Sequence, residues 1–207
     1  MDAVITFLRR SRLARFGLSA LSVALLLTAA GFLGYPFYTN LYQSRVQNRL
    51  EKEIASPEHA ERYRQAALEV GDALTRIKIP RLDVDVVVVE GTTASALRAG
   101  AGHYRDTPLP CDIGNVAIAG HRTTYGKPFS NIDRLRPGDP IILETPVGRC
   151  TYEVSRDPFI VLPSDFSVVA NTPTASTLTL TTCHPKGSAR QRLIVRATMV
   201  QGGEVKA

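Results

Sequence analysis

The chain has 207 residues, and 44% of them are hydrophobic, which is enough for one globular domain with an appendage. Its net charge is +6, but residues 1–16 carry four arginines against one aspartate and so supply half of that charge. The remaining sequence is only weakly basic, which argues against nucleic-acid binding. The sequence also lacks a glycine-rich phosphate loop and internal repeats.

An uninterrupted apolar segment follows this basic segment. No charged residue occurs from Gly17 to Ser44, and about twenty apolar residues are enough for one helix to cross a bilayer. We therefore expect a transmembrane signal anchor over 17–42, with the basic segment 1–16 in the cytoplasm and the rest of the chain outside. The alternative is a cleaved signal peptide, since small residues occur at 28–30.

Residues 43–73 are polar, mixed in charge and helix-prone. Ser56 and Pro57 predict the start of a new helix, because serine caps helices and proline fits their first turn. We interpret 43–73 as an extracytoplasmic stalk; the alternative is a helical appendage that packs on the domain. On the first interpretation, residues 1–43 serve only as an anchor.

Residues 74–207 read as an all-β domain. Short β-rich runs alternate with glycine- and proline-rich turns, a pattern that favours a closed β-barrel with short helices. The expected strands are 76–80, 84–89, 115–121, 141–145, 149–155, 176–185 and 192–200, with a short helix at 93–98.

Three of these strands place chemically active residues at their ends. His121 ends one strand, Cys183 lies at the end of a second, and Arg192 opens a third. An ordinary thiol is mostly protonated at neutral pH, so a nucleophilic cysteine needs a base, which an imidazole supplies. A guanidinium can stabilise the oxyanion that forms when a carbonyl is attacked. The combination indicates acyl transfer through a thioester.

The motifs around these residues resemble those of the sortases, the cysteine transpeptidases of Gram-positive bacterial surfaces. Thr179–Cys183 (TLTTC) matches the family's T-L-x-T-C motif, and Arg192 lies where the family places its arginine. The histidine segment, NVAIAGHRTTYG from Asn115, is similar to that of the actinobacterial class E branch. The resemblance extends over about residues 74–200.

The resemblance implies a sortase-type barrel over 74–207 and a transpeptidase mechanism. Cys183 would attack a C-terminal sorting signal of the type Leu-Ala-x-Thr-Gly between Thr and Gly, His121 would transfer protons, and Arg192 would hold the oxyanion. The acyl group would pass to an amine, on a lipid-linked peptidoglycan precursor or another acceptor. The expected location is the outer face of the cell membrane, where secreted proteins with sorting signals are the substrates.

Three further residues are candidates for contact with the substrate. Tyr104 offers an aromatic ring with a polar tip beside the expected cleft, and Thr181 and Thr182 immediately precede the cysteine. We expect His103 to serve as a hydrogen-bonded or solvated loop residue, and Arg122 to be an orienting or surface charge.

The sequence does not decide whether the other two cysteines form a disulfide. Cys111 and Cys150 would form a disulfide in an exported domain only if their Cα atoms came within about 6 Å. The four histidines show no metal-ligand spacing, so we expect no metal and no cofactor.

Two other functions remain as alternatives. An L,D-type cell-wall transpeptidase also uses cysteine and histidine, although that family places them close together in sequence. A catalytically inactive barrel that binds a surface partner is the second alternative.

Overall fold

The computed structural model describes residues 12–201, so the expected features of residues 1–11 and 202–207 lie outside the described part. The chain divides into two compact units, one ending at Thr39 and the other beginning at Asn40. The second unit therefore starts within the segment 17–42 that the sequence assigns to the anchor.

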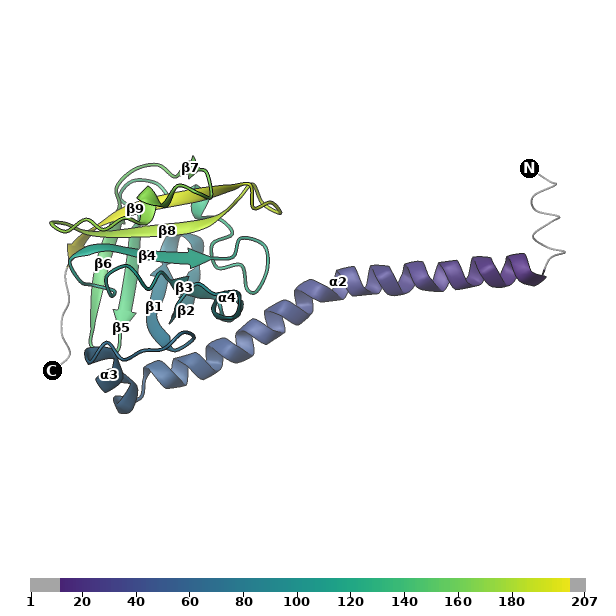
Figure 1. The fold of residues 1–207 in the computed structure, drawn as a ribbon, viewed down its shortest axis with the longest axis horizontal. Helices are drawn as coiled ribbons and strands as arrows, with labels where there is room; N and C mark the ends of the chain where they lie inside the picture. Colours follow the sequence, from purple (N-terminus) through teal and green to yellow (C-terminus); the bar gives the residue numbers. More distant parts are fainter. Residues whose placement is uncertain (1–11, 202–207) are drawn as a thin grey trace. The chain divides into compact units, whose positions relative to one another are not determined.

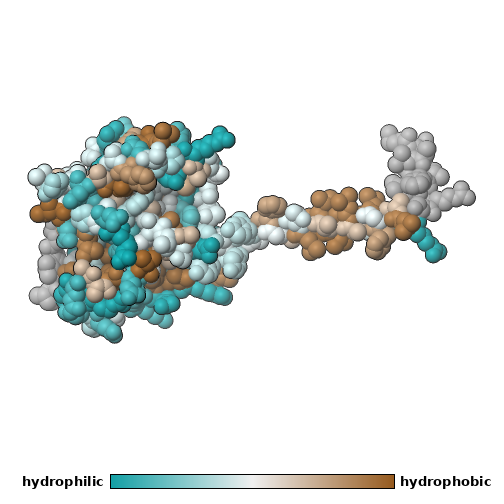
Figure 2. Space-filling model, viewed as in Figure 1, coloured by the Kyte–Doolittle hydropathy of each residue, from teal (hydrophilic) through white to brown (hydrophobic). Residues whose placement is uncertain are grey.

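The long apolar helix expected from the sequence is present. Helix α2 spans Arg12–Ile54, and among residues 12–201 it is the one helix long and apolar enough to cross a membrane. Leucine and phenylalanine side chains of its first half are exposed, and Figure 2 shows these apolar residues gathered along the helix. Helix α2 is thus a candidate membrane span.

The second unit is built around a sheet of short strands (Figure 1). In chain order they are β1 Ala73–Ile79, β2 Val84–Glu90, β3 Ala101–His103, β4 Gly114–Gly120, β5 Pro140–Thr145, β6 Gly148–Val154, β7 Phe159–Val161, β8 Ser176–His184 and β9 Gln191–Gln201. The short helices are α3 Pro57–Arg64, α4 Ala94–Ala99 and three 3-10 turns at Pro80–Leu82, Ile132–Arg134 and Phe166–Val169.

The sheet closes on itself. Within residues 12–201 the order is β6-β5-β1-β2-β3-β4-β8-β9, and β6 also pairs with β9, which completes an eight-stranded barrel. Strand β7 adds to the other half of β9. The expected closed β-barrel is confirmed.

The barrel core follows from strand alternation, since successive side chains of a strand point to opposite faces. The core cluster includes Val116 and Ile118 of β4, Leu178 and Leu180 of β8, and Leu193, Val195 and Ala197 of β9. Every second residue of these strands therefore faces the interior. The residues between them face outward, and that outer face carries the chemistry described below.

The segment 43–73 packs on the barrel in this structure, as a helical appendage. Gln47 of α2 is buried, and its amide donates to the carbonyl oxygens of Val87 and Ala99 at 2.9 and 2.8 Å. Its side-chain oxygen accepts from the Val87 amide at 2.7 Å. Leu50 contributes to a small apolar cluster with residues of β1, β2 and α4, so the end of α2 is fixed by both hydrogen bonds and apolar contact.

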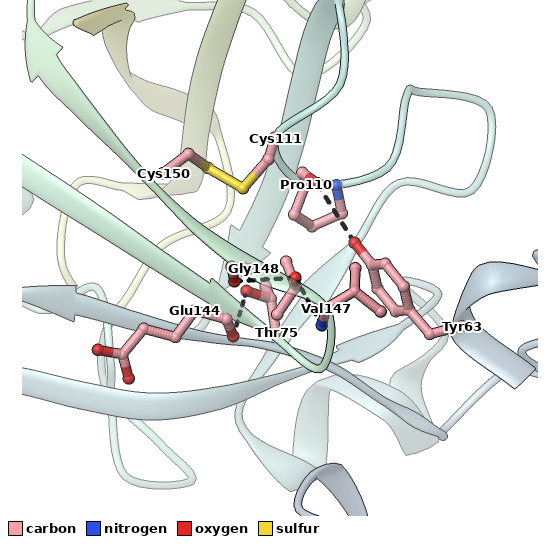
Figure 3. The surroundings of a disulfide bond; sticks show 9 residues. Tyr63, Thr75, Pro110, Cys111, Glu144, Val147, Gly148 and Cys150 are labelled. Carbon is pink, nitrogen blue, oxygen red and sulfur yellow. Dashed lines mark hydrogen bonds between the residues drawn. A yellow bond between two sulfur atoms is a disulfide. The ribbon is translucent and has the colours of Figure 1, made fainter. Parts of the chain in front are cut away.

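Helix α3 begins as the sequence predicts. The Ser56 hydroxyl accepts a hydrogen bond from the His59 amide, and Pro57 occupies the first turn. Tyr63 of α3 is buried and donates to the Pro110 carbonyl oxygen at 3.3 Å (Figure 3). Helix α3 therefore supports the loop that precedes β4.

That loop is also tied covalently. Cys111 and Cys150 form a disulfide with a Cα–Cα distance of 5.7 Å (Figure 3), which settles the pairing that the sequence left open. The bond joins the loop before β4 to strand β6 across a sequence separation of 39 residues. Disulfides of this kind persist in oxidising compartments.

We expect the double substitution of Cys111 and Cys150 by alanine to lower the free energy of unfolding by about 2–4 kcal/mol, because it frees a loop of roughly 40 residues in the unfolded chain. Urea unfolding of the full-length chain in detergent micelles measures the change. Reducing the wild-type protein with dithiothreitol should give a similar loss and serves as the matched comparison. An unchanged midpoint in both experiments would show that the bridge carries no stability.

Candidate active site

Strand β8 lies between the two strands that bring the other candidate residues to its end. It pairs in parallel with β4, where Ala119 lies opposite Thr181. His121 follows two residues after Ala119, just as Cys183 follows Thr181, so the two are expected at the same level. On its other side β8 pairs antiparallel with β9, and Cys183 lies directly opposite Arg192. Strand β8 thus lies between β4 and β9 (Figure 1).

The three side chains also share a face. His121 lies an odd number of residues from the interior position Ile118, as Cys183 does from Leu180 and Arg192 from Leu193. Because side chains alternate along a strand, such residues point outward. Directly opposed residues of an antiparallel pair have Cβ atoms about 5 Å apart. The register therefore places the residues His121, Cys183 and Arg192 along one outer edge of the barrel.

These groups are partly accessible. Cys183, the free cysteine of the described chain, is half-buried, as are His121 and Arg192. Within residues 12–201 neither the thiol nor the His121 ring makes a hydrogen bond, whereas Arg192 Nη1 donates to the carbonyl oxygens of Ala189 and Gln191, both at 3.1 Å. The turn before β9 thus holds the guanidinium, while thiol and imidazole remain available to a substrate.

Burial sets the electrostatics of the histidine. Partial removal from water lowers the pKa of His121 below its usual 6.5, because burial disfavours the charged ring. The imidazole is accordingly neutral at physiological pH and able to accept a proton.

A tyrosine lies beside this edge. The Tyr104 hydroxyl and the Thr181 hydroxyl are 3.1 Å apart and share a hydrogen bond, which places the partly exposed Tyr104 over β8 close to the cysteine. Thr181 and Thr182 are each only 3% exposed. The Thr182 hydroxyl donates to the Gly120 carbonyl oxygen at 2.7 Å and so joins the ends of β4 and β8. The contact of Tyr104, Thr181 and Thr182 with substrate stays a prediction.

Comparison with known proteins identifies the family. A family model described as a sortase domain matches residues 77–200, more than half of the chain. The chain belongs to the sortase family. Sortases are cysteine transpeptidases, and in this sortase the candidate residues follow one another in the order histidine, cysteine, arginine, at 121, 183 and 192.

Several relatives carry the E designation. Sortase SrtE1 of Streptomyces coelicolor is 36% identical over 149 residues, which cover 65% of this chain and 42% of that protein. Sortase SrtE2 of the same organism is 28% identical over 227 residues, covering 95% of this chain and 88% of that protein. The expected likeness to class E sortases is confirmed, although this sortase spans only about two-fifths of the length of SrtE1.

Solved structures show the same fold. The sortase D5 transpeptidase of Clostridium perfringens superposes with a TM-score of 0.67 at 29% identity, covering 77% of this chain and 98% of that one. Sortase E from Streptomyces avermitilis gives a TM-score of 0.58 at 36% identity, covering 63% and 90%. The family match removes the L,D-type transpeptidase from consideration.

Arg122 joins the two strand ends of this sortase. It is only 5% exposed, and its Nη1 donates to His184 Nδ1 at 2.8 Å and to the Cys183 carbonyl oxygen at 3.3 Å. Its other nitrogens contact the Ser130 carbonyl oxygen and form an ion pair with Asp133 at 3.2 Å. The sequence suggested an orienting or surface charge. The structure shows a buried arginine, directly after His121, that binds the backbone of Cys183 and the ring of His184.

We expect Arg122→Lys to lower the free energy of unfolding by about 1–3 kcal/mol, because a single ammonium group cannot satisfy the acceptors that the guanidinium now binds. Turnover should fall as well, since the end of β8 loses its tie to β4. Thermal unfolding and peptide turnover measure the two effects, and Arg134→Lys, an exposed change nearby, is the control. Wild-type behaviour of both variants would show that these contacts of Arg122 are dispensable.

His103 lies inside the protein, hydrogen-bonded as expected, but it is the last residue of strand β3 and not a loop residue. It is 1% exposed; Nδ1 contacts Glu90 Oε2 at 3.1 Å and Nε2 lies 2.9 Å from the Pro108 carbonyl oxygen. These bonds fix the loop that carries Tyr104. Between residues 12 and 201, no cluster of three or more His, Cys, Asp or Glu side chains is placed to hold a metal ion.

Proposed function

We propose that this sortase is a membrane-anchored transpeptidase that cleaves a sorting signal of the type Leu-Ala-x-Thr-Gly between Thr and Gly. The observation that carries the proposal is the register of β4, β8 and β9, which brings His121, Cys183 and Arg192 to one outer edge of the barrel. These residue types at one edge suit acyl transfer and serve no evident role in the barrel core.

In the first half-reaction the Cys183 sulfur attacks the threonine carbonyl carbon, and the thiol proton passes to His121. The Arg192 guanidinium stabilises the oxyanion. When the C–N bond breaks, His121 gives the proton to the departing glycine amine, and a thioester remains on Cys183.

In the second half-reaction an amine attacks the thioester carbonyl. His121 takes a proton from the amine and returns it to the sulfur as the C–S bond breaks. The product is a new amide, and thiol and imidazole are restored. The acceptor we propose is the amine of a lipid-linked peptidoglycan precursor or a chemically similar surface amine, and the donors are secreted proteins with a C-terminal sorting signal.

Helix α2 supports a location at the cell membrane, because it is long and apolar enough to span a bilayer. The basic residues before it favour a cytoplasmic N-terminus, and the Cys111–Cys150 disulfide fits an oxidising outer compartment. Anchoring enzyme, substrate and lipid-linked acceptor in one membrane plane would raise their effective concentration.

Activity should depend on pH through His121. Because burial lowers the pKa of this ring, we expect the acid limb of kcat/KM for a Leu-Ala-x-Thr-Gly peptide to have its midpoint below 6.5. Stability should change in the same direction: the unfolded chain binds more protons between the lowered pKa and 6.5, so the free energy of unfolding falls as pH falls through that window. An acid limb centred above 6.5 would contradict the neutral-base role.

The direct test is mass spectrometry of the acyl-enzyme. Full-length protein in detergent micelles is mixed with a Leu-Ala-x-Thr-Gly peptide, quenched with acid and digested. We expect the peptide acyl group, ending at Thr, on Cys183, and its release when an amine such as diaminopimelate is added. Cleavage without a Cys183 adduct, or no cleavage at all, would overturn the proposal.

A further inference from the structure

The loop that follows His121 folds back over its ring. The Tyr125 and His121 rings have centroids 5.4 Å apart and planes inclined by 35°, so the tyrosine covers one side of the imidazole. Tyr125 and Lys127 both have positive φ angles, 48° and 42°, a backbone region that side chains other than glycine seldom adopt. Such a conformation persists only where its surroundings hold it.

Those surroundings come from helix α2. The Tyr42 ring meets the Tyr125 ring edge-on, with centroids 6.3 Å apart and planes at 76°, an arrangement that aromatic pairs favour. Asn40 Oδ1 accepts a hydrogen bond from the Gly126 amide at 3.3 Å. The chain of contacts thus runs from α2 through Tyr125 to His121.

Gly126 shows how closely the helix approaches. Its φ is +70°, and a Cβ atom at this position would lie 2.5 Å from Gln43 Oε1. Gln43 is itself only 9% exposed, so its side chain fills the space that the missing Cβ leaves. The buried hydrogen bonds of Gln47, one turn further along, fix this part of α2 to β2. The helix is therefore an anchored support for the loop.

We propose that Asn40, Tyr42 and Gln43 of α2 position the catalytic imidazole through Tyr125. The segment that directly follows the apolar span would then act on the chemistry, whereas on the stalk interpretation residues 1–43 serve only as an anchor. Tyr125 is a positioning residue: it touches His121 and need not touch the substrate. The inference rests on the proposed role of His121, but its geometric part can be tested without turnover.

The first experiment observes the ring itself. The full-length chain in detergent micelles, labelled with ¹³C at histidine Cε1, has four histidines, and His121→Gln assigns the signal of interest. Because a nearby aromatic ring shifts resonances, Tyr125→Ala should move the His121 signal. Tyr42→Ala should move it too, whereas Leu41→Ala, an exposed change in the same turn, should not. A His121 signal that stays at its wild-type position in Tyr42→Ala overturns the proposal.

The second experiment measures turnover of a Leu-Ala-x-Thr-Gly peptide by the same variants. We expect Tyr125→Ala to lower kcat about tenfold with KM little changed, a part of the 10²- to 10⁴-fold that a positioned acid–base group supplies. Tyr125→Phe keeps the ring and should restore most of the rate, and Gly126→Ala should reduce kcat because it displaces Gln43. If Tyr125 had only a structural role, Tyr125→Ala would lower thermal stability without lowering kcat relative to KM. Equal kcat in Tyr125→Ala and wild type would refute the coupling.

The two experiments separate the inference from the function on which it rests. If the wild-type protein did not cleave the peptide, the proposed function would fail while the NMR result still reported on the contact. If the peptide were cleaved and Tyr42→Ala changed neither signal nor kcat, the function would stand and the positioning role would be lost.

Discussion

Cys183→Ala is expected to reduce turnover of a Leu-Ala-x-Thr-Gly peptide by about 10⁴-fold or more, because removal of a nucleophile leaves only binding and oxyanion stabilisation. Cys183 is half-buried at the end of β8 and makes no side-chain hydrogen bond within the described residues. Its loss should therefore change the free energy of unfolding by less than about 1 kcal/mol. Peptide cleavage and thermal unfolding of the full-length chain measure both quantities.

The other cysteines offer a matched control for the thiol. The Cys111→Ala/Cys150→Ala pair removes two sulfurs from the same molecule but leaves Cys183 in place, so it should lose stability and retain the chemical step under conditions where it stays folded. Should Cys183→Ala retain measurable turnover while folded, the thiol would have no part in the reaction and the inactive binding module would return as an alternative.

Local patterns in the sequence were sufficient to predict most strands of the barrel. The alternation in residues 176–185 predicted a strand that ends near Cys183, and β8 spans Ser176–His184. The glycine-rich stretch around Gly102 was instead expected to be a loop, and it contains β3. A Cβ at Gly102 would lie 2.2 Å from the Gly91 carbonyl oxygen. Glycine here allows two neighbouring segments to approach closely, and the sequence alone does not distinguish such a glycine from one in a turn.

Long-range contacts account for what the sequence did not predict. Gln43 and Gln47 look like residues of a solvated stalk, but both are buried, and the Gln47 amide pairs with backbone groups of Val87 and Ala99, 40 and 52 residues away. Arg122 was expected to be an orienting or surface charge, and its partners at 183 and 184 approach only once β4 and β8 pair. Buried polar groups of this kind are paired, and a single sequence does not show which partners the fold will bring.

Arg192→Lys is the second change with a large expected effect. Its register opposite Cys183 places the start of the arginine side chain beside that of the cysteine, and the carbonyl oxygens of Ala189 and Gln191 hold the guanidinium. Lysine keeps the charge but offers a flexible ammonium in place of a planar fork. We expect kcat to fall about 10²- to 10³-fold, as when one oxyanion donor is removed, with a smaller change in KM.

Arg190→Lys is the matched control for Arg192→Lys, because Arg190 is an exposed arginine two residues earlier in the same turn; it should retain wild-type kcat. The yield of thioester on Cys183 in single-turnover experiments adds a second measure, since an oxyanion role requires Arg192→Lys to slow acylation itself. A kcat within twofold of wild type for Arg192→Lys would make the arginine a structural element of the β8–β9 turn. The oxyanion would then have to be stabilised by another donor at this edge.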